Sequence, residues 1–317
     1  MLLIMNRVHD IFMCLNLNNM NLCFKENCKI QDDIIVYSKE KYDSQLSLVK
    51  MGKKKSSNFE DNSFEKDVSK EKNNEFVCEY RGYIWKNSFF KNSEQLENYL
   101  QISKKMIPND NFMTSYEYLI TENYILEKMD DLGSDLFDYI EKNVLSEGKT
   151  YNLICTLIYK LYLLHAEQIA HRDIKPENIM YNGSTDTIFY IDFTMSTFSN
   201  NKEIFNGGTA HYASPEIIYN NNLVLDDWRK VDIWSLGITI YIILFSQYPW
   251  SNLYNCKLFK KYKNSPNKYN YWLDKTGNRF YAYILTKCLD LDEKQRSSVE
   301  LLYKYSKKFK SVYDMSE

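Results

Sequence analysis

The sequence predicts an α+β chain with two lobes, a small antiparallel strand-rich lobe that contains one helix and a larger, mainly helical lobe. Between residues 76 and 90, β-branched and aromatic residues flank a short turn, as in a hairpin. From Leu153 to Leu164, apolar residues recur at three- and four-residue steps, which is typical of an amphipathic helix. The 317 residues are 44% hydrophobic and 26% charged, a globular composition with enough apolar material for a large core.

The charge balance argues against several classes of partner. Forty basic and forty-two acidic side chains give a formal net charge of -2, so no overall field favours nucleic acid or an anionic membrane. The apolar run from Ile233 to Phe245 is about half a membrane span, which predicts a buried helix. Polar residues interrupt the apolar start of the chain within its first ten positions, so we expect no secretion signal. We therefore predict no nucleic-acid partner and no membrane partner.

The cysteines indicate the compartment. The seven cysteines are odd in number and scattered, and they contain no C-x-x-C pair. Reduced thiols in the cytoplasm or the nucleus fit this pattern best. Nothing in the composition indicates an oligomeric state.

The chain divides into three parts by composition. Residues 1–60 have weak periodicity and end in a polar, lysine-rich stretch, so we expect an N-terminal extension and linker. Residues 61–305 form the expected domain, with a small lobe at about 61–127 and a large lobe at about 130–305. Residues 306–317 are expected to be a C-terminal tail.

The expected elements of the small lobe follow in order. Two strands, 76–80 and 83–90, flank the turn Arg81-Gly82, and a helix over 93–104 begins at the N-cap candidate Ser93. Strand character returns at 116–121 and 123–127, before an amphipathic segment over 135–143.

The chemistry-bearing segment follows the first long helix and reads His171-Arg172-Asp173-Ile174-Lys175-Pro176-Glu177-Asn178. It resembles the catalytic loop of the eukaryotic protein kinases, because it matches their H-R-D-x-x-x-x-N pattern at each fixed position. Further matches occur in family order over roughly residues 70 to 305: Asp192-Phe193-Thr194, Gly208 to Glu216, Asp232-Ile233-Trp234-Ser235-Leu236-Gly237, and Arg296. The resemblance implies a protein-kinase-like fold.

Phosphoryl transfer needs cations, metal ligands and a group that orients the attacking hydroxyl. The resemblance implies that Asp173 orients the acceptor and accepts its proton, while Lys175 neutralises the transferring phosphate. Lys175 together with Thr209 is similar to the serine/threonine-specific members, so we expect a protein substrate with a Ser or Thr acceptor. The expected cofactors are ATP and Mg²⁺.

Asn178 and Asp192 are the predicted metal ligands, because carboxylate and amide oxygens are the hard ligands that Mg²⁺ prefers. They lie fourteen residues apart, on either side of a predicted hairpin of 179–181, a turn at Asn182-Gly183, and 188–191. A hairpin brings its two ends together, so both side chains can reach one site.

The nucleotide-binding residues of the small lobe are placed by the resemblance. Lys86 best matches the family's strand lysine, and Glu97 is its expected helix partner, with Glu94 as the alternative. Lys50 is a weaker match, since a polar linker follows it. The segment Glu127-Lys128-Met129 resembles the hinge that offers main-chain groups to adenine. Asp135 is expected to reach the ribose.

Two departures from the family concern the phosphate site. The chain has no G-x-G-x-x-G and only nine glycines; the expected position of that loop reads Ser69-Lys70-Glu71-Lys72-Asn73-Asn74. Glycines there let backbone N–H groups approach phosphates closely. Thr194 replaces the glycine of D-F-G, which narrows the backbone freedom next to Asp192.

The resemblance also implies a regulatory contact and two structural ones. Arg172 is expected to bind a phosphate on the segment after Asp192, where Ser196, Thr197 and Ser199 lie; the alternative is that these are ordinary loop hydroxyls. His171 is expected to be a packing residue, and Glu216 with Arg296 is similar to the family's buried ion pair.

These observations predict a serine/threonine protein kinase. Two alternatives remain open: a pseudokinase-like scaffold that binds nucleotide or protein, suggested by the missing glycines and Thr194, and a small-molecule phosphotransferase of related fold.

Overall fold

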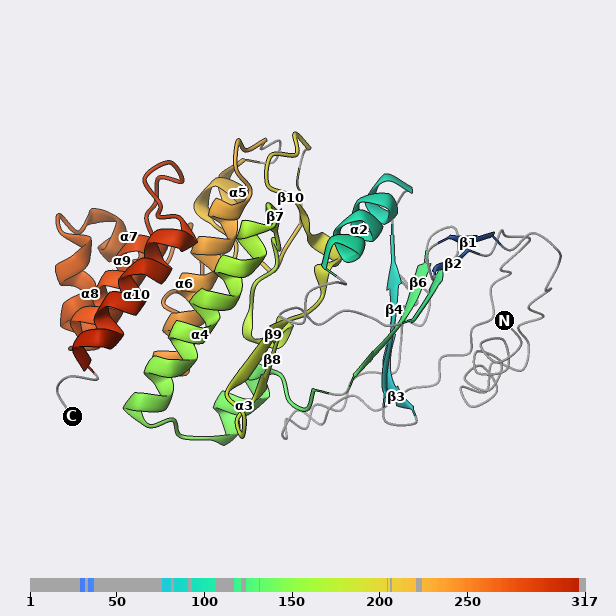
Figure 1. Ribbon diagram of the computed structural model, residues 1–317. Coiled ribbons are helices and arrows are strands. Elements are labelled where there is room, and N and C mark those ends of the chain that lie inside the picture. The colour runs from blue at the N-terminus through green and yellow to red at the C-terminus, as the bar shows by residue number, and fades with distance from the viewer. Residues whose placement is uncertain are drawn as a thin grey trace, which may run out of the picture. The chain divides into compact units, whose positions relative to one another are not determined.

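The computed structural model describes residues 29–31, 34–36, 76–80, 83–90, 93–106, 117–120, 124–130, 132–203, 205, 207–220 and 224–313. The chain forms two compact units (Figure 1). The first contains residues 1–97 and 114–131, and the second contains residues 98–113 and 132–317. This α+β organisation, with strands first and helices after, confirms the predicted fold class.

The first unit is built on a six-stranded sheet with the order β1-β2-β5-β6-β4-β3. Its strands are β1 (Lys29–Gln31), β2 (Ile34–Val36), β3 (Phe76–Tyr80), β4 (Tyr83–Phe89), β5 (Glu117–Ile120) and β6 (Tyr124–Asp130). All neighbours are antiparallel except β2 and β5, which are parallel. The predicted hairpin is confirmed, because Tyr80 of β3 lies opposite Tyr83 of β4. Strand β6 runs three residues beyond the expected end at Glu127.

Helix α2 (Ser93–Met106) begins at the expected residue, with Glu94 in its first turn and Lys104 and Lys105 in its last turn. These charges complement the helix dipole at both ends. The residues of the expected N-terminal extension lie outside the described ranges, apart from β1 and β2.

The second unit is mainly helical. Its helices are α3 (Leu136–Lys142), α4 (Glu147–Ala166), α5 (Pro215–Tyr219), α6 (Arg229–Phe245), α7 (Lys257–Asn264), α8 (Lys268–Thr276), α9 (Arg279–Cys288) and α10 (Val299–Tyr313). The short elements between them are β7 (Ile169–Ala170), η1 (Pro176–Asn178), β8 (Ile179–Asn182), β9 (Thr187–Tyr190), η2 (Phe193–Met195) and β10 (Thr197–Phe198). Helix α10 continues through most of the segment that was expected to be a tail.

The core of this unit lies between α4, α6, α9 and α10 (Figure 1). The apolar run of α6 is buried on all sides, from Val231 to Ile243, as predicted for a core helix. In the described part of the chain, no helix combines the length and hydrophobicity needed to cross a membrane.

Gly237 allows α6 and α9 to approach each other closely. A Cβ atom at this position would lie 2.7 Å from the Cβ atom of Cys288 and 2.8 Å from Cδ2 of Leu289, both in a packed core. We expect Gly237→Ala to lower the free energy of unfolding by about 1–3 kcal/mol, because overpacking forces neighbours out of place. Gly148→Ala, at an open position in the first turn of α4, is the matched control and should leave stability unchanged or slightly higher. Equal denaturation midpoints for the two variants would contradict this packing argument.

Candidate active site

The hairpin of β8 and β9 places the two predicted metal ligands at its open end. Ile179 pairs with Tyr190, and the amide of Ile191 donates to the carbonyl oxygen of Asn178 at 3.0 Å. Asp192 is the next residue, so the ends of the hairpin bring Asn178 and Asp192 into neighbouring positions. This is the arrangement that the predicted turn at Asn182-Gly183 required.

Asp173 lies at the centre of a hydrogen-bonded cluster. Its Oδ2 atom accepts from Nζ of Lys175 at 2.8 Å and from Nδ2 of Asn178 at 2.9 Å. Its Oδ1 atom accepts from the backbone amide of Thr209 at 3.1 Å and from Oγ1 of Thr209 at 2.8 Å. Lys175 also donates to Oγ1 of Thr209 at 2.8 Å, which closes the ring of contacts. Four predicted residues from two separate motifs, the His171–Asn178 segment and the Gly208–Glu216 segment, therefore meet at the Asp173 carboxylate.

Gly208 makes the approach of Thr209 possible. Its φ of +82° lies in the left-handed region that glycine adopts readily, and a Cβ atom there would come within 3.2 Å of the carbonyl oxygen of Arg172. The backbone of this segment can therefore lie directly against the loop that bears Asp173.

Asp232, on α6, binds the backbone of the loop that bears Asp173, a role that was not predicted from the sequence. Its buried carboxylate accepts the backbone amides of His171 and Arg172, both at 2.7 Å, and Oδ2 lies 2.9 Å from Nε2 of His165. Arg172 has a φ of 65°, an unusual conformation for a residue with a side chain. The hydrogen bonds from the backbone amides of His171 and Arg172 to Asp232 stabilise this conformation. A single carboxylate inside the otherwise apolar run of α6 is the signal that could have identified this anchor.

His171 is fully buried and lies in the core, as expected. Its Nε2 atom is 2.9 Å from the carbonyl oxygen of Ile191, and its ring lies 4.9 Å from that of Phe193. The expected ion pair of Glu216 and Arg296 is also present: both guanidinium Nη atoms donate to the carboxylate, at 2.7 and 2.9 Å.

The predicted phosphate contact of Arg172 is replaced by a carboxylate. Nη1 of Arg172 lies 2.6 Å from Oε1 of Glu203, and the guanidinium carbon lies 4.2 Å from the centre of the Phe205 ring. The two charges are in direct contact, so the carboxylate of Glu203 compensates the burial of the guanidinium. Burial lowers the pKa of Arg172, and the charge of Glu203 opposes that shift.

The proposed phosphorylation positions are correspondingly inaccessible. Ser196, Thr197 and Ser199 are at most 5% exposed. The Ser196 hydroxyl donates to the carbonyl oxygen of His171, Thr197 accepts from the Asn201 side chain, and Ser199 donates to Gln168. A phosphate on one of them could pair with Arg172 only if the phosphorylated side chain left its buried position, so the hypothesis remains a prediction beside the alternative of ordinary loop hydroxyls.

Glu203→Gln should destabilise this segment, because it removes the carboxylate that directly contacts the buried guanidinium of Arg172. We expect a loss of about 1–3 kcal/mol in the free energy of unfolding and faster proteolysis within residues 193–213. Glu300→Gln, which removes the exposed partner of Lys304, is the control and should have no measurable effect. If the two variants unfold alike, the Glu203 contact does not hold the segment.

Thr194 makes a contact that a glycine could not. Its Oγ1 atom donates to Oδ1 of Asp192 at 2.7 Å, and Asp192 itself has a φ of 66° in the left-handed region. Thr194 does not have a positive φ, so its backbone conformation does not require glycine. The replacement therefore adds a hydrogen bond that orients the Asp192 carboxylate.

The oxygen atoms of Asn178 and Asp192 are suitable ligands for the Mg²⁺ of a magnesium nucleotide. Nδ2 of Asn178 donates to the backbone oxygen and to Oδ2 of Asp173, while its Oδ1 atom accepts no hydrogen bond from any described residue. That amide oxygen and the Asp192 carboxylate are hard ligands of the kind that Mg²⁺ takes along with phosphate oxygens and water. Within the described ranges, no group of three or more His, Cys, Asp or Glu side chains forms a metal cage of protein ligands alone.

The other predicted nucleotide-binding residues lie at the following positions. Lys86 is half-buried in β4, directly opposite Glu127 of β6, and Glu97 is exposed on α2. Glu127 is 2% exposed and is flanked by β4 and β5, so it lies within the sheet, and Met129 lies further along the same strand. The Lys86–Glu97 pair and the adenine contacts remain predictions. The expected phosphate-loop segment, residues 69–74, lies outside the described residues.

Asp135 is the N-cap of α3. Its Oδ1 atom accepts from the backbone amide of Asp138 at 2.8 Å, which stabilises the start of the helix. The predicted ribose contact therefore involves a carboxylate that already has a structural role, and it remains a prediction.

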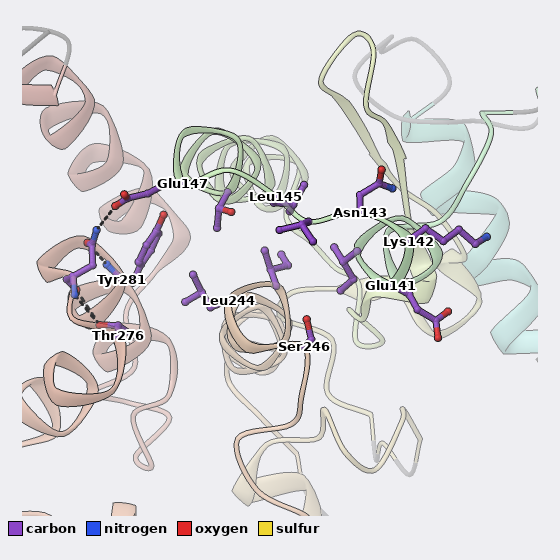
Figure 2. Close-up of a pocket in the computed structure, with 14 residues that line it drawn as sticks. Glu141, Lys142, Asn143, Leu145, Glu147, Leu244, Ser246, Thr276 and Tyr281 are labelled. Carbon is purple, nitrogen blue, oxygen red and sulfur yellow. Dashed lines mark hydrogen bonds between the residues drawn. The ribbon is translucent and has the colours of Figure 1, made fainter. Parts of the chain in front are cut away.

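A pocket of about 710 Å³ lies elsewhere in the second unit, between the ends of α3 and α6 and the starts of α4 and α9 (Figure 2). Glu141, Asn143, Leu145 and Leu244 line it, and Asn278 donates to Glu147 at its wall at 3.3 Å. It contains none of the predicted site residues. A much narrower recess, lined by Asp173, Gly208, Thr209 and Tyr212 among others, lies beside the hydrogen-bonded cluster around Asp173.

Comparison with known proteins agrees with this geometry. Residues 66–306 match a family model described as "Protein kinase domain". The chain is 32% identical over 231 residues to calcium-dependent protein kinase 5 of Plasmodium falciparum, covering 69% of this chain and 39% of that protein. It is 32% identical over 202 residues to a probable serine/threonine-protein kinase of Dictyostelium discoideum, covering 62% and 23%. It is 33% identical over 178 residues to serine/threonine-protein kinase chk1 of Schizosaccharomyces pombe, covering 53% and 34%. The chain thus matches less than half the length of each of these relatives.

Proposed function

Because the chain belongs to the protein kinase family, we propose that it transfers the γ-phosphate of ATP to a serine or threonine hydroxyl of a protein. The observation that carries the proposal is the cluster around Asp173, in which a carboxylate, an ammonium group and two further donors meet at one point. The relatives with serine/threonine kinase names support the same class of acceptor.

The cluster indicates how the acceptor gains access to Asp173. Lys175, Asn178 and Thr209 donate six hydrogen bonds within the cluster, and four of them occupy the two carboxylate oxygens. A carboxylate offers about four acceptor positions, so an incoming hydroxyl must displace one donor. Lys175 has a flexible stem and a charge that the transferring phosphate attracts. We therefore expect Lys175 to leave Oδ2 for the phosphate, which frees Asp173 to orient the hydroxyl and take its proton.

The remaining residues hold this arrangement in place. Thr209 donates two hydrogen bonds to Oδ1 and so keeps the carboxylate plane fixed. Asn178 and Asp192 are the groups that would hold Mg²⁺, which when bound with ATP neutralises charge on the transferring group.

Phosphate transfer to a mixed set of unstructured proteins tests the proposal. With γ-labelled ATP and Mg²⁺, we expect label on serine and threonine, and none when EDTA is present. A folded chain that binds magnesium nucleotide without transferring label would instead be a pseudokinase-like scaffold. Label that appears only on members of a metabolite panel would assign a small-molecule acceptor.

A further inference from the structure

Helix α7 carries an uncompensated positive charge. Between Ser251 and Leu273 the chain has five lysines and no aspartate or glutamate, although the whole chain is nearly neutral. Four of these lysines lie on α7 and are exposed: Lys257, Lys260, Lys261 and Lys263. The opposite face of the helix is anchored by the buried rings of Phe259 and Tyr262. The result is a short, firmly seated helix whose outer face is cationic.

Some exposed lysines of the second unit have an acidic partner, and others, including these four, have none among the described residues. Lys142, Lys202 and Lys304 each lie within 3.3 Å of a carboxylate. None of the four α7 lysines has an acidic partner within ion-pair distance in the described part of the chain. Lys257 is also the first residue of the helix, where a cation opposes the helix dipole and lowers helix stability. Lys261 and Lys263, in the last turn, favour the dipole instead, so only the charge at the start of α7 opposes the fold.

Exposed apolar side chains accompany the lysines. Tyr219 and Tyr254 are 50% and 60% exposed, and their rings meet edge to face with centroids 5.4 Å apart. The Tyr219 hydroxyl donates to the carbonyl oxygen of Leu253, and the Tyr254 hydroxyl donates to that of Ile218. Leu258, on α7 itself, is 49% exposed. The two rings are thus held rigidly at the surface, which lowers the entropy that a binding partner must overcome.

The same part of the chain is connected to the catalytic cluster. Thr209 bonds to Asp173, and the Tyr212 hydroxyl, three residues later, lies 3.3 Å from that of Tyr248 in the loop before α7. Helix α5 begins directly after this segment and ends in Tyr219. The segment from Thr209 to Tyr219 therefore contacts Asp173 at one end and Tyr254 at the other.

We propose that the face formed by Lys257, Leu258, Lys260, Lys261, Lys263, Tyr219 and Tyr254 binds an acidic segment of the protein substrate that also carries a large apolar side chain. This inference rests on the proposed kinase function and adds a substrate class to it. The lysines attract the carboxylates, and the tyrosine pair and Leu258 contact the apolar side chain.

The structure favours a protein over other anionic partners. The tyrosine rings meet edge to face, with their hydroxyls bound to the backbone, and so do not present a parallel platform for stacked bases. The main apolar residues of α7 face the core, so the helix lacks the broad apolar face that a membrane-surface helix needs. An extended acidic segment of a protein needs neither a stacking platform for bases nor a broad apolar helix face.

Direct binding of a labelled peptide tests the inference without any phosphate transfer. The probe is a twelve-residue fluorescent peptide of Glu and Asp with one Phe and one Leu and no Ser, Thr or Tyr, and the measurement is fluorescence anisotropy with the full chain. We expect saturable binding that weakens at least tenfold between 50 and 500 mM salt. Lys257→Glu/Lys260→Glu should weaken binding at least tenfold, although the charge reversal at the helix start favours α7. Tyr254→Ser should weaken it through loss of the apolar contact.

The control is Lys304→Glu/Lys307→Glu, which reverses two exposed charges on α10 and should leave peptide binding unchanged. Transfer to a short neutral Ser/Thr peptide should be equal in the wild type and the α7 variant, which separates failure of this inference from failure of the proposed function. Equal peptide binding by the wild type and the α7 variant overturns the inference. Tighter binding of a single-stranded RNA oligonucleotide, or of phosphatidylserine vesicles, that is lost in the same variant also overturns it.

Discussion

Asp173→Asn is expected to lower the rate of phosphate transfer by about 10²–10⁴-fold, the range typical of a lost general base. Asparagine has nearly the same shape, but its neutral amide neither takes the proton of the acceptor nor attracts Lys175. The variant should still fold, since the anchors of the loop are the amide contacts to Asp232 rather than the side chain of Asp173. Initial rates of label transfer at saturating ATP give the comparison.

Asp274→Asn is the matched control, because Asp274 is exposed on α8 and lies outside the catalytic cluster. It should retain the wild-type rate. If Asp173→Asn transfers phosphate as fast as Asp274→Asn does, Asp173 has no part in orienting the acceptor.

Arg296→Met is expected to cause the largest loss of stability, about 3–5 kcal/mol in the free energy of unfolding, because it leaves the Glu216 carboxylate buried without a partner. The Arg296 side chain is fully buried, that of Glu216 is 9% exposed, and the guanidinium also donates to the carbonyl oxygens of Lys230 and Asp290. Urea denaturation followed by the near-ultraviolet signal of the buried tryptophans measures the loss.

The double variant Arg296→Met/Glu216→Leu distinguishes the ion pair from simple packing. Removing both charges should recover much of the stability, because no uncompensated charge remains. Lys304→Met, which removes the cation of an exposed pair, is the control and should unfold as the wild type does. A double variant that is less stable than Arg296→Met would mean that packing, not charge, dominates at this site.

The local elements were predictable because each leaves a pattern in adjacent residues. The hairpin of β3 and β4 follows from strand-forming residues around Arg81-Gly82, and the burial of α6 follows from its continuous apolar run. The β8–β9 hairpin was predictable in the same way, and it accounts for the neighbouring positions of Asn178 and Asp192.

The contacts that sequence reasoning missed join residues far apart in the chain. Arg172 and Glu203 are separated by thirty-one positions, and Asp232 lies sixty residues from the amide that it anchors. Contacts over such separations leave no helical or strand periodicity in the sequence. Thr197 likewise pairs with Ala170 where β10 meets β7, and strands of two residues leave no pattern in the sequence. The contacts of these side chains are determined by packing between segments that are distant in the sequence.

The magnesium dependence of phosphate transfer in Asp192→Asn tests the central claim most directly, because it links a single side chain to both the metal and the reaction. We expect the rate at saturating magnesium to fall at least a hundredfold and the magnesium midpoint to rise. Thr194→Val, which removes the hydroxyl that donates to Asp192 and keeps a β-branched side chain, should have a much smaller effect. An Asp192→Asn protein with the wild-type rate and the wild-type magnesium midpoint would contradict the account.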